Sequence, residues 1–226
     1  ANKVISLIEK IFKNKTILFP AFSNDIVYEK KYDIVRSSIN TGLIPKLLLR
    51  KNYYRTFSPL HSFLVKGPEI KDIKKLKQVT TWGKGSVFEW LEKKNARWVA
   101  FNLPWERGCA FAHRSEEICK VPYRYYKTFR GELYKNGKYV KNIKEIKYSN
   151  YKNVNLIKDN ISPYKTLEKK DSFNFFINKG LYANTALTKD ITRHNCEFLL
   201  KDKLGRIKNK LHVKNWIKRR FNKKSK

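Results

Sequence analysis

The sequence predicts an α/β protein with an open, layered sheet flanked by helices. Residues 4–12 carry apolar side chains at helical spacing, and the short apolar strand TILFPAFS follows them and ends near Pro20. Further along, a strand expected to be buried over 97–103 leads through the small residues GCA into a helix. Helices that alternate with strands are typical of crossover connections, and strand-to-helix passages are where such sheets place ligand sites.

Length and composition limit the class of protein. With 226 residues, of which 41% are hydrophobic, the chain is long enough to bury a real core. We expect one α/β domain over 1–200 and a basic helix or tail over 201–226. The 51 Lys and Arg against 19 Asp and Glu give a net charge of +32. This charge favours nucleic acid, acidic membrane surfaces or phosphorylated small molecules as partners, and it disfavours polycationic substrates.

The cysteines indicate the compartment. Cys109, Cys119 and Cys196 are an odd number and have neither CxxC nor zinc-ligand spacing. We therefore expect reduced thiols, no metal site and a cytoplasmic location. No apolar run approaches the roughly 18 residues that a membrane crossing needs, and the N-terminus does not resemble a signal peptide.

The first half of the chain gives further local expectations. Residues 23–36 have the composition of a loop, and Ser38 is expected to cap a helix over 41–50. Residues 61–65 are expected to form a strand, because an apolar run here ends at a Gly-Pro pair. The charged segment 71–77 is expected to be solvated surface.

The catalytic chemistry is expected in the stretch from Trp105 to Glu132, which reads WERGCAFAHRSEEICKVPYRYYKTFRGE. His113 and Glu116 are three residues apart, so on a helix they lie on one face. This pair supplies a general base and a carboxylate to orient it. Because an HxxE spacing is common, a His113 that only caps or packs a helix start is an equal alternative.

Two further clusters are candidates for binding. Gly83 and Gly85 precede Ser86, an N-cap for a helix over 87–93, and free N–H groups at a helix start favour the phosphates of a cofactor. An ordinary turn with a cap is the favoured alternative, because GxGS is shorter than a P-loop. His61 and Ser62 lie near a strand start, where a histidine taken alone is more often structural than catalytic. In the company of His113, we expect them to converge with it at strand ends of one sheet.

Six segments in order carry a family resemblance: TILFPAFS, SSINTGLIPKLLLR, RTFSPLHSFLVKGPE, WGKGSVFEWL, ARWVAFNLPW and the HxxE with VPYRYYKTFRGE. Together they resemble the aminoglycoside 3-N-acetyltransferase family over residues 4–131, and most closely its members associated with polysaccharide biosynthesis. The resemblance implies an acyltransferase fold over 1–200. It also implies that the N-terminal part of the family fold, which contributes to the CoA site, is missing from this sequence.

The resemblance implies transfer of an acetyl group from acetyl-CoA to the amine of an amino sugar, in surface polysaccharide biosynthesis. His113 would take the proton of the attacking amine, and Glu116 would orient the imidazole. The Ser62 hydroxyl or a backbone N–H would stabilise the oxyanion. The residues implied to line the substrate site are His61, Ser62, Tyr123 and Arg124.

One departure bears on the acceptor. The family's HPTHS reads SPLHS here, so that Ser58 and Leu60 replace a polar pair. Together with the charge of +32, this favours an amino sugar linked to a nucleotide or lipid phosphate over a polycationic aminoglycoside. The alternatives are an aminoglycoside resistance enzyme, a nucleic-acid-binding protein and a non-catalytic relative. Nucleic acid is disfavoured because no binding motif is present and the basic residues are spread along the chain.

The C-terminal third predicts a hairpin over 131–150, because apolar and polar residues alternate around Asn136-Gly137. In the basic segment 201–226, apolar residues stand among twelve basic ones at spacings that give a helix an apolar stripe. This segment is either a helix packed on the body or one that binds an anionic surface at the inner membrane. The residues that we assign to the stripe are Leu204, Ile207, Leu211, Trp216, Ile217 and Phe221.

Overall fold

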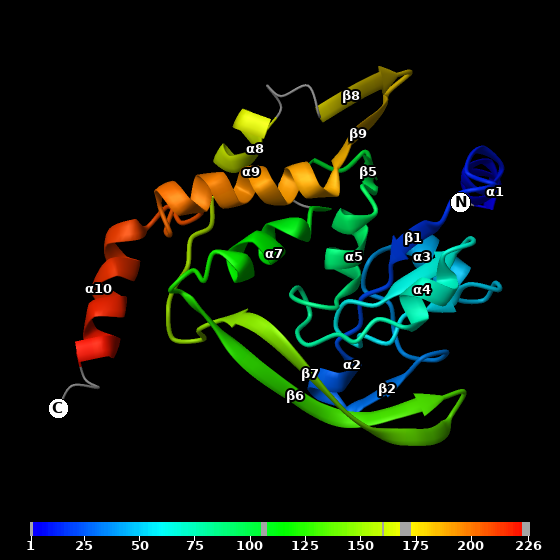
Figure 1. Cartoon of the computed structure of the whole chain (residues 1–226), viewed down its shortest axis with the longest axis horizontal. Helices are drawn as coiled ribbons and strands as arrows, with labels where there is room; N and C mark the ends of the chain where they lie inside the picture. Colours follow the sequence, from blue (N-terminus) through cyan, green and yellow to red (C-terminus); the bar gives the residue numbers. More distant parts are fainter. Residues whose placement is uncertain (1, 105–107, 160, 168–172, 223–226) are drawn as a thin grey trace. The chain divides into compact units, whose positions relative to one another are not determined.

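The structure, a computed structural model, describes residues 2–104, 108–159, 161–167 and 173–222. The chain divides into two compact units (Figure 1). Unit 1 contains residues 1–81 and 127–147, and unit 2 contains residues 82–126 and 148–226. Trp105, the first residue of the expected catalytic stretch, and the last residues of the basic tail lie outside the described residues.

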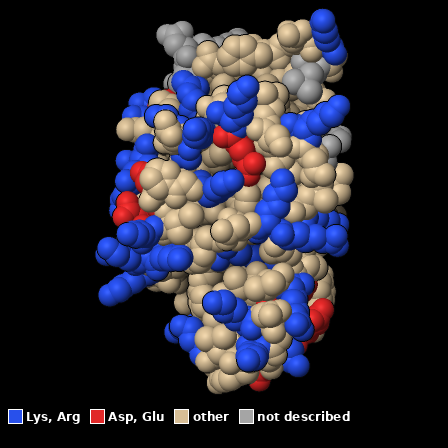
Figure 2. Space-filling view, turned by 90° about the vertical axis from the view of Figure 1, so that its right-hand side faces the viewer, with Lys and Arg blue, Asp and Glu red and all other residues tan. Residues whose placement is uncertain are grey.

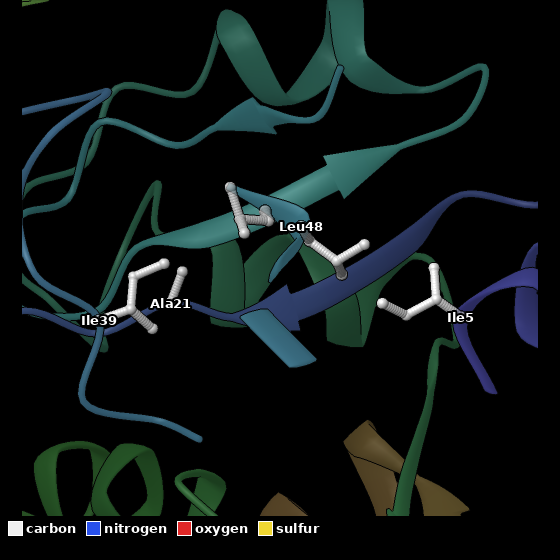
Figure 3. Close-up of a cluster of buried hydrophobic side chains, with 5 residues drawn as sticks. Ile5, Ala21, Ile39 and Leu48 are labelled. Atoms are coloured by element: carbon white, nitrogen blue, oxygen red, sulfur yellow. The ribbon is translucent and has the colours of Figure 1, made fainter. Parts of the chain in front are cut away.

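Unit 1 is built on a small antiparallel sheet. Its central strand β4 pairs with β1 on one side and with β3 on the other. Helix α1 carries Ile5 against this sheet, and Figure 3 shows the cluster that Ile5 forms with Ala21, Ile39 and Leu48. The elements up to residue 81 are α1 (Asn2–Ile11), β1 (Ile17–Pro20), α2 (Asp25–Tyr28), β2 (Lys31–Asp33), α3 (Leu43–Leu48), β3 (Tyr54–Arg55), β4 (Phe63–Lys66) and α4 (Ile70–Lys74).

The expected loop over 23–36 was wrong in part, because it contains α2 and β2. Strand β2 pairs in parallel with β6 (Arg124–Lys135), which in turn pairs with β7 (Lys138–Asn150). The Asp33 carboxylate accepts the N–H groups of Asn136 and Gly137 at the turn between β6 and β7. This strand is held by partners about a hundred residues away in the sequence, so local composition does not reveal it.

Two other local expectations for unit 1 were also wrong. Gly42, not Ser38, occupies the N-cap of α3, and the Ser38 hydroxyl instead donates to Asp25. The strand expected over 61–65 begins only at Phe63, so His61 and Ser62 precede it. The charged residues of 71–77 are exposed, as expected of solvated surface, although the segment contains α4 and its Ile73 is buried.

Unit 2 contains a second antiparallel sheet of three strands in the order β5-β9-β8. Helix α9 packs beside α7, as Figure 1 shows, and also contacts α5 and α8. Strand β5 was expected to be buried, but only its Ala100 is, and Arg97, Val99 and Phe101 on the opposite face are exposed. The elements are α5 (Val87–Lys93), β5 (Arg97–Phe101), α7 (Phe111–Ile118), α8 (Ser162–Leu167), β8 (Phe173–Asn178), β9 (Leu181–Leu187), α9 (Thr188–Lys201) and α10 (Lys210–Asn222).

The basic C-terminal segment contains α10, which belongs to unit 2 and packs against the rest of it. Val213 is fully buried, and the Trp216 ring lies 5.0 Å from the Tyr151 ring. Leu204 and Ile207 are buried before the helix begins, whereas Leu211 is exposed. The side chain of Phe221 is outside the described residues. Within the described chain, no helix has both the length and the hydropathy of a membrane crossing.

Candidate active site

Helix α7 carries the HxxE pair in the middle of unit 2. Phe111, Ala112 and Ser115 form its buried face, and the Ser115 hydroxyl lies within hydrogen-bonding distance of the Thr192 carbonyl on α9. This packing fixes the rotation of α7 about its axis. His113 and Glu116 lie on one face of α7, as their three-residue spacing predicts.

The two side chains are in direct contact. His113 Nδ1 lies 2.9 Å from Glu116 Oε2. The Glu116 carboxylate is 0% exposed, whereas the His113 side chain is 37% exposed. The imidazole is therefore the member of the pair that a substrate can reach. On its other side the His113 ring packs against Trp82, with ring centroids 5.3 Å apart.

Both oxygens of Glu116 have further partners. Arg124 Nη2 lies 2.6 Å from Oε2, and the Tyr123 hydroxyl donates to Oε1 over 2.9 Å. Lys158 Nζ and Arg206 Nε lie 3.3 Å and 3.6 Å from Oε1. Burial alone would raise the pKa of Glu116, but Arg124 and Lys158 hold that pKa well below its usual range. Glu116 is therefore an ionised, fully buried carboxylate.

These neighbours also determine the protonation state of His113. Partial burial of the ring and the adjacent Arg124 guanidinium lower the pKa of His113, so the imidazole is neutral at pH 7. Nδ1 lies 2.9 Å from Glu116 Oε2, which can only accept, and also 2.9 Å from Arg124 Nη2, which can only donate. In the tautomer that donates Nδ1–H to Glu116, the lone pair lies on Nε2. The arrangement supplies a neutral imidazole, which burial and the neighbouring cations make a weaker base than a free histidine.

The VPYR segment has a different position from the one expected of a substrate-binding segment. Tyr123 and Arg124 are buried, and both bind Glu116. Arg124 also donates to the Tyr148 carbonyl, which ties the segment to β7. In this structure the two residues contact the buried Glu116 of the pair. A direct contact with substrate stays a prediction.

Sequence reasoning missed Lys158 and Arg206. Lys158 lies in the irregular segment after β7 and forms an isolated β-bridge with Ile207, which brings both basic side chains to α7. Neither lies near the HxxE in the sequence or belongs to a local motif. The available signal was weak, because lysine and arginine are abundant throughout the chain.

His61 and Ser62 belong to unit 1, and both are buried. The His61 ring packs on Phe22, with centroids 4.6 Å apart, and the Ser62 hydroxyl donates to the Ala21 carbonyl. Ser62 also accepts from Arg55 Nε. Strands β4 and β5 belong to different sheets, so the expectation of strand ends in one sheet was wrong. The convergence of these residues with His113 stays a prediction.

The glycine-rich turn before α5 serves the helix itself. The Ser86 hydroxyl accepts the Glu89 N–H over 3.2 Å, and the Glu89 carboxylate accepts the Gly85 N–H over 2.8 Å. This reciprocal arrangement is a capping box shifted by one residue. Two of the N–H groups expected to bind phosphate are thus occupied. A cofactor role for Gly83, Gly85 and Ser86 stays a prediction. Among the described residues, no group of His, Cys, Asp and Glu is placed to hold a metal ion.

A sequence profile of the aminoglycoside 3-N-acetyltransferase family matches residues 1–187. The chain belongs to this family. Membership makes it an N-acyltransferase that uses acetyl-CoA as co-substrate, which confirms the predicted reaction class and donor. No curated protein sequence is significantly similar to the chain.

Solved structures confirm the fold. The aminoglycoside acetyltransferase AAC(3)-IIb has a TM-score of 0.70 at 15% identity, over 88% of this chain and 83% of that one. The complex of AAC-IIIb with CoASH has a TM-score of 0.66 at 13% identity, over 83% and 78% of the two chains. AAC(3)-IVa with gentamicin C1A has a TM-score of 0.63 at 17% identity, over 84% and 70%.

Proposed function

We propose that the protein acetylates the amine of an amino sugar that is carried on a nucleotide or lipid phosphate, within surface polysaccharide biosynthesis. The observation that supports the acetyl transfer most is the partly exposed, neutral imidazole of His113, whose Nδ1 lies beside the ionised Glu116. The amine nitrogen must lose a proton as it bonds to the thioester carbon. Within the pair, the imidazole is the group that can take that proton.

In this mechanism His113 Nε2 removes the proton as the amine nitrogen bonds to the thioester carbon. The imidazolium that forms is stabilised by the Glu116 carboxylate next to Nδ1, and it then returns the proton to the sulfur of the departing CoA. Glu116 itself is not the base, because it has no exposed surface and its oxygens are already occupied. A backbone N–H is the better donor for the oxyanion than Ser62, whose hydroxyl proton goes to Ala21.

Charge supports a phosphate-bearing acceptor. Figure 2 shows Lys and Arg side chains over much of the visible face, with few Asp and Glu among them, in keeping with the net charge of +32. A polycationic aminoglycoside is repelled by such a field, whereas a sugar phosphate is attracted.

An aminoglycoside acceptor is the second candidate, and it is favoured by the relative whose structure contains gentamicin C1A. Calorimetry with acetyl-CoA, followed by a thiol-release assay, separates the two. The acceptors to compare are free amino sugars, nucleotide-linked amino sugars and aminoglycosides. We expect the highest kcat/KM with the nucleotide-linked sugars. A preference for aminoglycosides would overturn the acceptor assignment, and no binding of acetyl-CoA would overturn the proposed function.

We also propose that the protein is cytoplasmic and binds the inner membrane peripherally through the basic face of α10. Lys214 and Lys218 on this helix are exposed, and each contributes about 1 kcal/mol near an anionic surface at low salt. Trp216 packs on Tyr151, so charge rather than insertion of this ring would carry the binding.

Co-sedimentation with phosphatidylserine vesicles tests this membrane proposal. Replacing Lys214 and Lys218 with Gln should weaken binding by about 2 kcal/mol at low salt. Replacing the exposed Lys71 and Lys75 of unit 1 removes the same charge and should have less effect. These point changes are preferable to deletion of 202–226, which would remove the buried Leu204 and Ile207. Equal binding by both variants would contradict a role for α10.

A further inference from the structure

Lys158 is the cation beside the catalytic pair that reaches solvent. Its Nζ lies 3.3 Å from Glu116 Oε1, and its side chain is 20% exposed. The side chains of Arg124 and Arg206, which approach the same carboxylate, are almost completely buried. His113 and Lys158 therefore contact opposite oxygens of Glu116, and both are open to a bound molecule.

Among the described residues, three cations approach the single carboxylate of Glu116. Lys158 and Arg124 both have Glu116 as their carboxylate partner, and within the described chain neither has another. Arg124 Nε is also buried without a hydrogen-bond partner. Buried cations that lack a counter-charge are costly unless an anion compensates them. Burial and the nearby Arg124 lower the pKa of Lys158 to about 8, although Glu116 opposes this shift.

We propose that Lys158 binds a phosphate group of the acceptor, next to the amine that His113 deprotonates. This inference rests on the proposed function and identifies the part of the site that recognises the acceptor. The phosphates of acetyl-CoA are a poor fit here, because the long pantetheine arm separates them from the thioester that must lie beside His113. A phosphate ester close to the reacting amine is therefore the matching chemistry.

Histidine side-chain NMR with inorganic phosphate tests the contact without any turnover. The chain has 4 histidines, so the imidazole signals are readily resolved. Phosphate bound at Lys158 should shift the His113 signals and raise the pKa of His113, because an anion stabilises the imidazolium. Lys158→Met should abolish this response, and Lys158→Arg should keep it. The matched control is Lys93→Met, which removes the same charge from an exposed lysine 3.3 Å from Glu89 and should respond like the wild type.

Steady-state kinetics provide a second test of phosphate binding by Lys158. Loss of a hydrogen bond to a charged group should raise the KM for glucosamine 1-phosphate on the order of 10–100-fold in Lys158→Met. Because Lys158 also keeps Glu116 charged, kcat should fall alike for glucosamine and glucosamine 1-phosphate. The KM for glucosamine and for acetyl-CoA should change little, and a rise for acetyl-CoA instead would overturn the assignment of the phosphate to the acceptor. A His113 response to phosphate that persists in Lys158→Met overturns this inference alone. Absence of acetyl transfer to every acceptor counts against the proposed function.

Discussion

Glu116 in unit 2 and Glu145 in unit 1 are both buried glutamates, yet their pKa values shift in opposite directions. Glu116 faces Arg124 and Lys158, which hold its pKa well below the usual range. Glu145 accepts hydrogen bonds from the Ser58 hydroxyl, the Thr81 hydroxyl and the Leu60 N–H, and burial dominates these bonds and raises its pKa.

The difference shows that partners, and not burial alone, decide the role of a buried carboxylate. Ser58 and Leu60 donate hydrogen bonds to Glu145 and so attach the SPLHS segment to β7, which is a structural role. Cations keep Glu116 charged beside an imidazole, which is the arrangement that a base needs. Perturbed carboxylates next to a reachable histidine are typical of active sites.

The largest effect should come from replacing His113, which Glu116 contacts at Nδ1. His113→Ala should lower the rate of acetyl transfer on the order of 10²–10⁴-fold, because it removes the proton acceptor. Circular dichroism should show an unchanged fold, since the imidazole is partly exposed. The control is His212→Ala, at an exposed position of α10, which should retain wild-type turnover. Full turnover by His113→Ala would refute the assignment of the base.

Glu116→Gln should destabilise the protein by about 3–5 kcal/mol, because Arg124 and Lys158 would lose their buried counter-charge. In the fraction that remains folded, turnover should fall less than in His113→Ala, since the amide removes orientation and charge balance but leaves the base. Urea unfolding and a thiol-release assay measure the two quantities. An equal or greater loss of turnover would mean that Glu116 is the base.

Glu145→Gln should cost about 1–3 kcal/mol, because the amide cannot accept every bond that the carboxylate accepts. The pKa of Glu145 is raised, so the wild-type carboxyl stabilises the fold most when it is protonated, and this contribution is lost as pH rises through the folded pKa. The loss of stability in Glu145→Gln should therefore be greater at pH 5 than at pH 8.

Glu116→Gln should show the opposite trend. Since the pKa of Glu116 is lowered, its contribution is present above the unfolded pKa of about 4.3 and is lost as pH falls below it. Unfolding of both variants at several pH values measures these slopes. Slopes of the same sign would show that the two carboxylates do not differ as described.

Local interactions explain what the sequence could predict. Ser86 caps α5, the three-residue spacing joins His113 to Glu116, and Asn136 with Gly137 turns the hairpin at positive φ, as an Asn-Gly pair allows. Each of these features depends on residues within four positions of one another. The reaction class came from six segments in family order rather than from any single pattern.

Long-range contacts explain what the sequence could not predict. Lys158 reaches Glu116 because of a bridge to Ile207, and the Ser58 segment is fixed by Glu145 in β7. No periodicity or motif in the sequence predicts either contact. The expected burial of β5 failed for a related reason, since an apolar run does not reveal whether a second layer covers the strand.

The protonation of His113 at pH 7 tests the central claim most directly. Nitrogen-15 NMR distinguishes the two neutral tautomers of an imidazole from each other and from the imidazolium. We expect the neutral ring with its proton on Nδ1, donated to Glu116, and the lone pair on Nε2. An imidazolium, or a proton on Nε2 with Nδ1 accepting from Arg124, would contradict the claim that Glu116 prepares His113 as the base.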